Sequence, residues 1–227
     1  MPCFIIDTTS IYDVSSALSA SEEAYVTVKE LIVTGELPGG ELISEGDIAT
    51  RMGVSRTPVR EAFLRLQAEG WMRLYPKRGA LVVPIAADEA ENVVSARRMI
   101  ETGSVKAMTV QTRAELALAL NRNLTLQREI AGSGPATAFS AVDADFHQSI
   151  VNAGDNPLLD TFYCGLRERQ RRMTTHSLAR DPGQIAGIIE DHDRLISLIQ
   201  AGDVEGFEIA VDRHMRRVHG WIVGTGL

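Results

Sequence analysis

The spacing of apolar and polar positions along this chain changes near residue 85. Beyond that point apolar residues recur every three or four positions, which is the spacing of one face of an α-helix. Breaker residues separate the later segments, at 132–135, 154–157, 181–183 and 202–203. The pattern predicts six amphipathic helices, at 88–109, 112–131, 135–153, 156–179, 183–201 and 203–222.

The stretch 24–84 is built from shorter segments. Apolar spacing predicts three short helices, at 24–34, from Ser44 to Gly53 and from Ser55 to Glu69. Pro58 is tolerated in the third helix because it falls in the first turn, where backbone N–H groups lack helical partners. Two extended runs flank Pro76-Lys77-Arg78-Gly79 and predict a hairpin. Three short helices followed by a hairpin are typical of a winged helix-turn-helix.

The expected fold class is therefore mainly α. Residues 1–23 are rich in serine, threonine and alanine and carry four acids without a lysine or arginine, so we expect a mobile arm there. A winged helix-turn-helix is expected over 24–84, and an all-α helical bundle over 85–227.

Composition narrows the class of protein. No run of about 18 apolar residues is present, which argues against a membrane span, and the N-terminus does not read as a secretory signal. Two cysteines cannot form a disulfide framework, so a cytoplasmic location is expected. The net charge of −7 argues against nucleic-acid binding by the chain as a whole. Residues 53–80, however, carry six basic residues and two acidic ones, which suits a small nucleic-acid-binding domain.

The segment 24–84 resembles the DNA-binding domain of the GntR family of bacterial transcription regulators. The resemblance lies in Gly35-Glu36-Leu37-Pro38, Ser44-Glu45, the run from Gly53 to Phe63 (GVSRTPVREAF), Leu66 to Gly70, and Arg78-Gly79. It implies DNA contacts from Ser55, Arg56, Thr57, Arg60 and Gly79.

Elementary chemistry agrees with these contacts. Arg56 and Arg60 are four residues apart and share a helix face, and arginine is the commonest bidentate reader of guanine. Lys77 and Arg78 at the hairpin tip suit the DNA backbone or the minor groove. The family commonly has an arginine where this chain has Gly46, so one contact is expected to be missing and the preferred operator to differ.

Polar residues interrupt the apolar stripes of the helical half. Asp143 and His147 lie four residues apart inside one stripe, and His192 and His214 lie inside two others. Buried polar groups need partners, and one carboxylate and three imidazoles converging in one bundle are satisfied best by a metal ion. The alternative is that each is a hydrogen-bonded core residue, which is the usual state of a lone histidine on an apolar face.

Residues 88–222 resemble the ligand-sensing FCD domain of the FadR subfamily. The matching pieces are Arg97 to Glu101 (RRMIE), Asp143 to His147 (DADFH), Asn156 to Leu159 (NPLL), Asp191-His192 with Leu195-Ile196, and His214. The resemblance implies a divalent ion (Zn, Ni, Fe or Mn) held by Asp143, His147, His192 and His214. Six helices suggest the shorter, VanR-like variant. His176 and His219 fall outside the pattern and are expected to be solvated or structural.

Arg97 lies near the inner stripe of its predicted helix, and an inward arginine needs an anionic partner. One interpretation is a structural ion pair with Glu101, one turn further on. The other, implied by the resemblance, is a clamp for the carboxylate of a small effector beside the metal.

The sequence therefore predicts a transcription regulator and not an enzyme. We expect a homodimer on palindromic operator DNA, because one recognition helix reads only a few base pairs. A small organic acid at the metal site is expected to control operator affinity. Two alternatives stay open at this point: a helical metal-dependent hydrolase, and a constitutive DNA binder with a structural metal.

Overall fold

The computed structural model describes residues 18–132 and 134–223. The chain divides into two compact units between Pro84 and Ile85, and each is described by itself. Within the described residues no helix has both the length and the apolar character that a membrane span requires.

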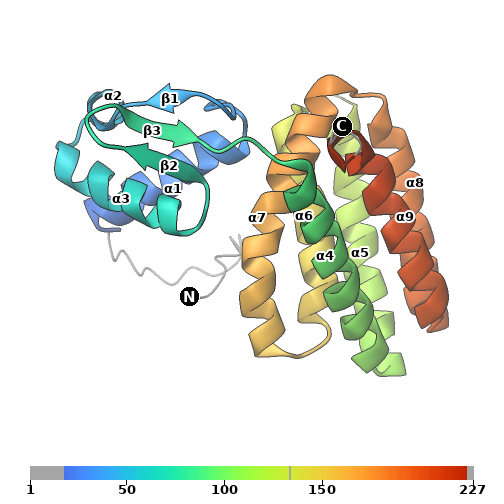
Figure 1. Cartoon of the computed structure of the whole chain (residues 1–227). Coiled ribbons are helices and arrows are strands. Elements are labelled where there is room, and N and C mark those ends of the chain that lie inside the picture. The colour runs from blue at the N-terminus through green and yellow to red at the C-terminus, as the bar shows by residue number, and fades with distance from the viewer. Residues whose placement is uncertain (1–17, 133, 224–227) are drawn as a thin grey trace. The chain divides into compact units, whose positions relative to one another are not determined.

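The first unit is a three-helix domain with a small sheet (Figure 1). Its elements are α1 (Ala20–Val33), β1 (Leu42–Ile43), α2 (Glu45–Met52), α3 (Arg56–Ala68), β2 (Met72–Tyr75) and β3 (Gly79–Val82). Val28, Phe63 and Leu66 are completely buried at the centre of one apolar core. The winged helix-turn-helix predicted from the sequence is confirmed.

The start of α1 corrects the predicted arm. The Ser19 hydroxyl accepts a hydrogen bond from the Glu22 backbone N–H at 3.1 Å and so caps the helix. The Glu22 carboxylate accepts from Arg65 of α3 at 2.8 Å. Residues 20–23 therefore belong to the first unit, and placing them in the arm was wrong. Residues 1–17 of the predicted arm lie outside the described residues.

The sheet contains one strand that the sequence pattern did not predict. Its order is β1-β3-β2, with both pairings antiparallel. Strand β1 is only two residues long, too short to show alternation. It pairs Ile43 with Ala80 and so fixes the hairpin to the segment that leads into α2.

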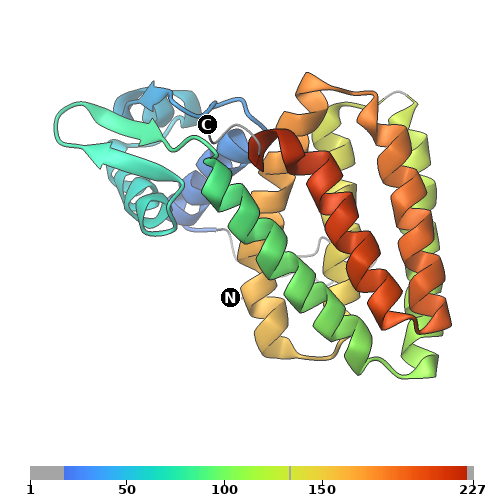
Figure 2. The ribbon, with the colours of Figure 1, turned by 45° about the vertical axis from the view of Figure 1, so that its right-hand side comes forward.

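The second unit is a bundle of six described helices, which Figures 1 and 2 show lying side by side. They are α4 (Ala87–Ala107), α5 (Val110–Ala131), α6 (Ala136–Asn152), α7 (Pro157–Arg180), α8 (Gln184–Ala201) and α9 (Val204–Val223). All six predicted helices are present, with ends shifted by no more than about two residues. Helix α4 packs against α6, α7 and α9, and α8 packs against α5 and α9. Three of these helices, α6, α8 and α9, carry the candidate metal ligands.

Candidate functional sites

Asp143, His147, His192 and His214 form one buried cluster, here called the quartet. Asp143 and His147 are one turn apart on α6, His192 lies on α8 and His214 on α9. All four are buried, and one candidate ligand atom from each lies within 4.8 Å of the others. The rings of His192 and His214 have centroids 4.9 Å apart. The structure thus brings together all four residues that the sequence singled out.

Each imidazole of the quartet has its Nδ1 atom at a hydrogen-bond acceptor. His147 Nδ1 lies 2.8 Å from Glu101 Oε2, and His192 Nδ1 lies 2.8 Å from Gln127 Oε1. His214 Nδ1 lies 3.1 Å from Asp191 Oδ2. Each oxygen favours the tautomer with a proton on Nδ1, which leaves Nε2 as the free electron donor.

The opposite edges of these rings face one another. The Nε2 atoms of His147 and His192 are buried and have no hydrogen-bond partner. Asp143 Oδ1 lies 3.5 Å from His192 Nε2, whereas Asp143 Oδ2 accepts hydrogen bonds from Gln170 at 2.8 Å and Thr174 at 3.3 Å. Asp143 Oδ1 and the imidazole Nε2 atoms therefore form an inward set of electron donors.

Burial sets the protonation of this cluster. It lowers the pKa of His147 and of His192 well below the ordinary value, and nearby positive charges add to the effect. Burial also raises the pKa of the Asp143 carboxyl, although the charge of Arg97 and the hydrogen bonds from Gln170 and Thr174 oppose that change. Neutral imidazoles with available lone pairs are the form that binds a metal ion.

Arg97 lies inside the bundle, 1% exposed, as the apolar stripe predicted. Its Nε donates to Glu101 Oε1 at 3.0 Å and to the Tyr163 hydroxyl at 3.1 Å. The predicted ion pair with Glu101 is confirmed. Because the other Glu101 oxygen holds His147, a single carboxylate connects the arginine to the quartet. One terminal nitrogen, Arg97 Nη2, is buried without a partner.

The two remaining histidines of the bundle differ from each other. His176 on α7 is exposed, in agreement with a solvated side chain. His219 on α9 is only 2% exposed, which agrees with the structural one of the two roles expected for it. It lies outside the quartet, and its Nδ1 is buried without a partner. Burial, together with the positive charge of Arg97, lowers the pKa of His219 well below the ordinary value.

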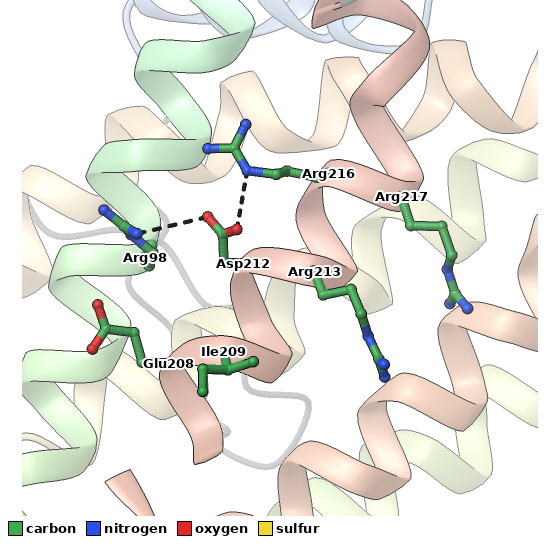
Figure 3. A pocket seen from close by; sticks show the side chains of 7 residues that line it. All are labelled: Arg98, Glu208, Ile209, Asp212, Arg213, Arg216 and Arg217. Atoms are coloured by element: carbon green, nitrogen blue, oxygen red, sulfur yellow. Dashed lines mark hydrogen bonds and ion pairs between the residues drawn. The ribbon is translucent and has the colours of Figure 1, made fainter. Parts of the chain in front are cut away.

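A hollow on the surface of α4 and α9 is lined in part by Arg217, which pairs with Asp191, the hydrogen-bond partner of His214. Figure 3 shows its lining, in which Asp212 pairs with Arg98 and Arg216, while Arg213 and Arg217 point the other way. Arg217 Nη2 lies 2.5 Å from the Asp191 carboxylate that also faces His214. Arg217 donates in addition to the Gly187 carbonyl of α8. His214 of the quartet is thereby linked, through Asp191, to a side chain that reaches solvent.

The supports of the quartet were not predicted, although the sequence carried a signal for each. Glu101 follows Arg97 by one turn on the same helix face, and Gln127 continues the buried spacing of Leu120 and Leu124 on α5. Asp191 directly precedes His192. The missing information was the partner across the bundle, which local spacing does not contain.

The DNA contacts predicted on α3 lie on the surface of the first unit. Ser55, Arg56, Thr57 and Arg60 are all exposed. Ser55 stands at the N-cap position of α3, but its side chain makes no capping hydrogen bond. Its hydroxyl is therefore available to a phosphate oxygen, as the exposed arginines are to base edges.

The hairpin forms the wing of this unit. Its tip exposes Lys77 and Arg78, with Lys77 in the left-handed region at φ 63°. Gly79 at φ 107° has a structural role as well, because a Cβ there would overlap the Ile43 carbonyl of β1. The absence of a side chain at Gly79 therefore lets the wing pack closely against the segment before α2.

A winged helix with an exposed basic face, joined in one chain to an all-helical domain, is the architecture of a DNA-binding transcription regulator. The family described as "Bacterial regulatory proteins, gntR family" matches residues 20–82, and the FCD domain matches residues 92–217. The chain therefore belongs to the GntR family and carries an FCD domain. The resemblance inferred from the sequence is confirmed.

Curated relatives and solved structures agree with this assignment. The chain is 30% identical to a probable D-xylose utilization operon transcriptional repressor of Paenarthrobacter nicotinovorans, over 81% of this chain and 80% of that protein. It is 26% identical to the gluconate operon transcriptional repressor of Bacillus subtilis, over 76% and 72%. A GntR regulator from Rhodococcus sp. RHA1 has the same fold, with a TM-score of 0.76 at 19% identity over 92% of this chain and 100% of that one.

Proposed function

We propose that this protein is a ligand-responsive transcription repressor whose quartet holds a divalent metal ion. The observation that carries the proposal is the common orientation of the three imidazoles, each with Nδ1 at an oxygen acceptor. Such supports fix the tautomer and the ring orientation of histidines that bind metal through Nε2. The buried Nε2 atoms of His147 and His192, which have no partner, fit this role.

The donor set limits which ion suits the quartet. Three imidazole nitrogens and one carboxylate oxygen suit Zn, Ni, Fe or Mn. If the ion is five- or six-coordinate, four protein ligands leave one or two positions for another molecule. A bound ion supplies Lewis acidity, which attracts an anionic oxygen to those positions.

Arg97 supports a carboxylate as the effector group. Its Nε is occupied by Glu101 and Tyr163, but its buried Nη2 is available. An arginine N–H and a metal ion together make charge-assisted, directional bonds to a carboxylate. The structural and the sensing interpretations of Arg97 are therefore compatible, since they use different nitrogens.

Effector binding must favour one arrangement of the bundle if it is to change operator affinity. We propose that the effector favours the arrangement that releases DNA, which makes the protein a repressor relieved by a small organic acid. Two relatives, described as repressors of a D-xylose utilization operon and of the gluconate operon, support the assignment as a repressor. By linkage, operator DNA then weakens effector binding by the same factor.

The form that binds DNA is proposed to be a homodimer on a palindromic operator in the cytoplasm. A single α3 helix presents only a few exposed contacts, so two copies are needed to specify a longer site. In the proposed complex Arg56 and Arg60 contact base edges in the major groove. Ser55 and Thr57, near the start of α3, contact the DNA phosphates. The contacts of the wing are made by Lys77, Arg78 and Gly79.

The proposal is tested by calorimetry with small mono- and dicarboxylates on metal-loaded protein. Wild type is compared with Arg97→Ala and His192→Ala, and His176→Ala serves as a control because that histidine is exposed. We expect a carboxylate that weakens operator binding to bind wild type and the control equally, and to bind the other two variants at least about tenfold more weakly, a loss of about 1.4 kcal/mol.

Each alternative gives a different result in these assays. If the carboxylate binds all four proteins equally well, neither the metal ion nor Arg97 is part of the site that senses it. Metal-dependent turnover of an ester or acid would support the hydrolase instead. Metal binding without any carboxylate effect on operator affinity would support a constitutive DNA binder with a structural ion.

A further inference from the structure

Gly46 is a glycine whose backbone does not need glycine. It lies in the first turn of α2, which Ser44 caps through the Asp47 backbone N–H at 3.0 Å. Its φ is not in the left-handed region. Alanine is a better helix former than glycine, because it costs less backbone entropy on folding. The local structure of α2 therefore gives no reason for glycine at this position.

The reason lies in the neighbouring helix. A Cβ on Gly46 would lie 3.2 Å from Arg56 Nη2 and 3.5 Å from both Arg56 Cζ and Arg56 Nε. The guanidinium of Arg56 thus rests on the bare backbone of α2. Arg56 is the first residue of α3, so its side chain reaches back across the turn between the two helices. An alanine at position 46 would require this guanidinium to shift by a few tenths of an ångström, and a longer side chain would displace it further.

The guanidinium of Arg56 lies between two helix starts. The first turn of α2 carries the acids Glu45 and Asp47 on either side of Gly46, and the N-terminal end of α3 carries the partial positive charge of its backbone. No ion pair of Arg56 occurs among the described residues, and its side chain is exposed. Holding an arginine here is useful when an external polyanion arrives, because the same backbone charges also attract that polyanion.

We infer that Gly46 is a specificity-determining residue of the DNA-binding domain, because its missing side chain seats the guanidinium of Arg56. The inference rests on the proposed operator binding through α3. Gly46 acts through Arg56 and is in this sense a positioning residue. A seated guanidinium meets a base edge from a fixed direction, and bidentate recognition of a base depends on that direction.

The test is Gly46→Ala, for which the two readouts move in opposite directions. Thermal unfolding should occur at a higher temperature, because alanine stabilises α2. Affinity should fall about tenfold for the duplex that wild type selects from a random-sequence library. The preference at one base position in each half-site should also relax when the variant repeats the selection.

Gly103→Ala is the matched control. Gly103 is an exposed glycine inside α4, and nothing lies within 4 Å of a Cβ added there. The same exchange should therefore raise stability without changing operator affinity or base preference. A loss of DNA binding in this control as large as in Gly46→Ala would overturn the inference, because the effect would then not depend on Arg56.

A double variant separates the inference from the proposed function. If Gly46 acts through Arg56, adding Gly46→Ala to Arg56→Ala should cause no further loss of affinity. Two results would reject the positioning of Arg56 by Gly46 while leaving the proposed operator binding intact. One is a full tenfold further loss of affinity in the double variant. The other is unchanged affinity and base preference in Gly46→Ala alone. A wild-type protein that selects no preferred sequence would instead reject the proposed function.

Discussion

The two units of the chain place their charged groups in opposite ways. In the first unit the candidate functional residues, among them Arg56, Arg60 and Lys77, are exposed. In the second unit Arg97, Glu101 and Asp143 lie inside the bundle and bind one another or the histidines. The first arrangement suits a partner that comes to the surface, and the second a partner small enough to enter. Substitutions in the first unit should therefore change DNA binding at little cost in stability, whereas substitutions in the buried network of the second unit should also lower stability.

The largest expected effect is in the buried network. Glu101→Gln leaves Arg97 as an uncompensated buried charge and weakens the support of His147. The free energy of unfolding should fall by about 3–5 kcal/mol, measured by denaturant titration. Glu91→Gln on the same helix is the control, because its partner Arg216 is exposed, and it should cost less than about 1 kcal/mol. Similar losses would contradict the comparison between buried and exposed charges.

Metal removal should have the next largest effect. Purified protein should carry close to one divalent ion per chain, as measured by elemental analysis. An ion present at a thousand times its dissociation constant stabilises the folded state by about 4 kcal/mol, and a chelator should abolish this gain. His192→Ala should lose the ion, whereas the exposed His176→Ala should keep it. Wild type that neither contains nor takes up an ion would reject the metal centre.

Exposed residues of α3 and of the wing should change DNA binding at constant stability. Arg56→Ala or Arg60→Ala should cost about 1–3 kcal/mol of operator binding and relax one base position, as measured by binding titrations on operator and random duplexes. Lys77→Ala should weaken binding to both duplexes alike and reduce the salt slope by about one. Equal losses on both duplexes for Arg56→Ala would contradict base reading.

The smallest expected effect concerns acid stability. Because the pKa of His219 is lowered in the folded state, this histidine binds a proton more readily when unfolded. Its contribution to stability is present above its ordinary pKa of about 6.5 and is lost as the pH falls below that value. His219→Asn should therefore reduce the loss of stability between pH 7 and pH 5 by about 1–2 kcal/mol. Identical pH profiles would exclude this contribution.

Most of the fold could be predicted because its signals are local. Each helix of the bundle has an apolar stripe of helical period, breakers separate the later helices, and the ends agree with the structure to within about two residues. The start of α1 was misplaced although Ser19 and Glu22, spaced as in a capping box, mark it. Strand β1 could not be predicted, because two residues carry no period and pair with a distant segment.

The candidate sites likewise contain residues that the sequence predicts and partners that it does not. The quartet could be predicted from polar residues inside apolar stripes, since a buried polar residue must find a partner. The identity of each partner could not, because Glu101, Gln127 and Asp191 meet their histidines only when helices far apart in sequence pack together. The contact of Arg56 with Gly46 likewise depends on the angle between α2 and α3.

The supports of the three histidines also differ in how they connect to solvent. Glu101 and Gln127 are completely buried, whereas the side chain of Asp191 is 12% exposed and shares its Oδ2 with Arg217, whose side chain is 47% exposed. The seam between α8 and α9 is therefore the point at which His214 can loosen without disturbing the rest of the quartet. Because salt screens exposed charges more than buried ones, rising ionic strength should weaken the Arg217–Asp191 pair before it affects the buried contacts of Glu101 and Gln127.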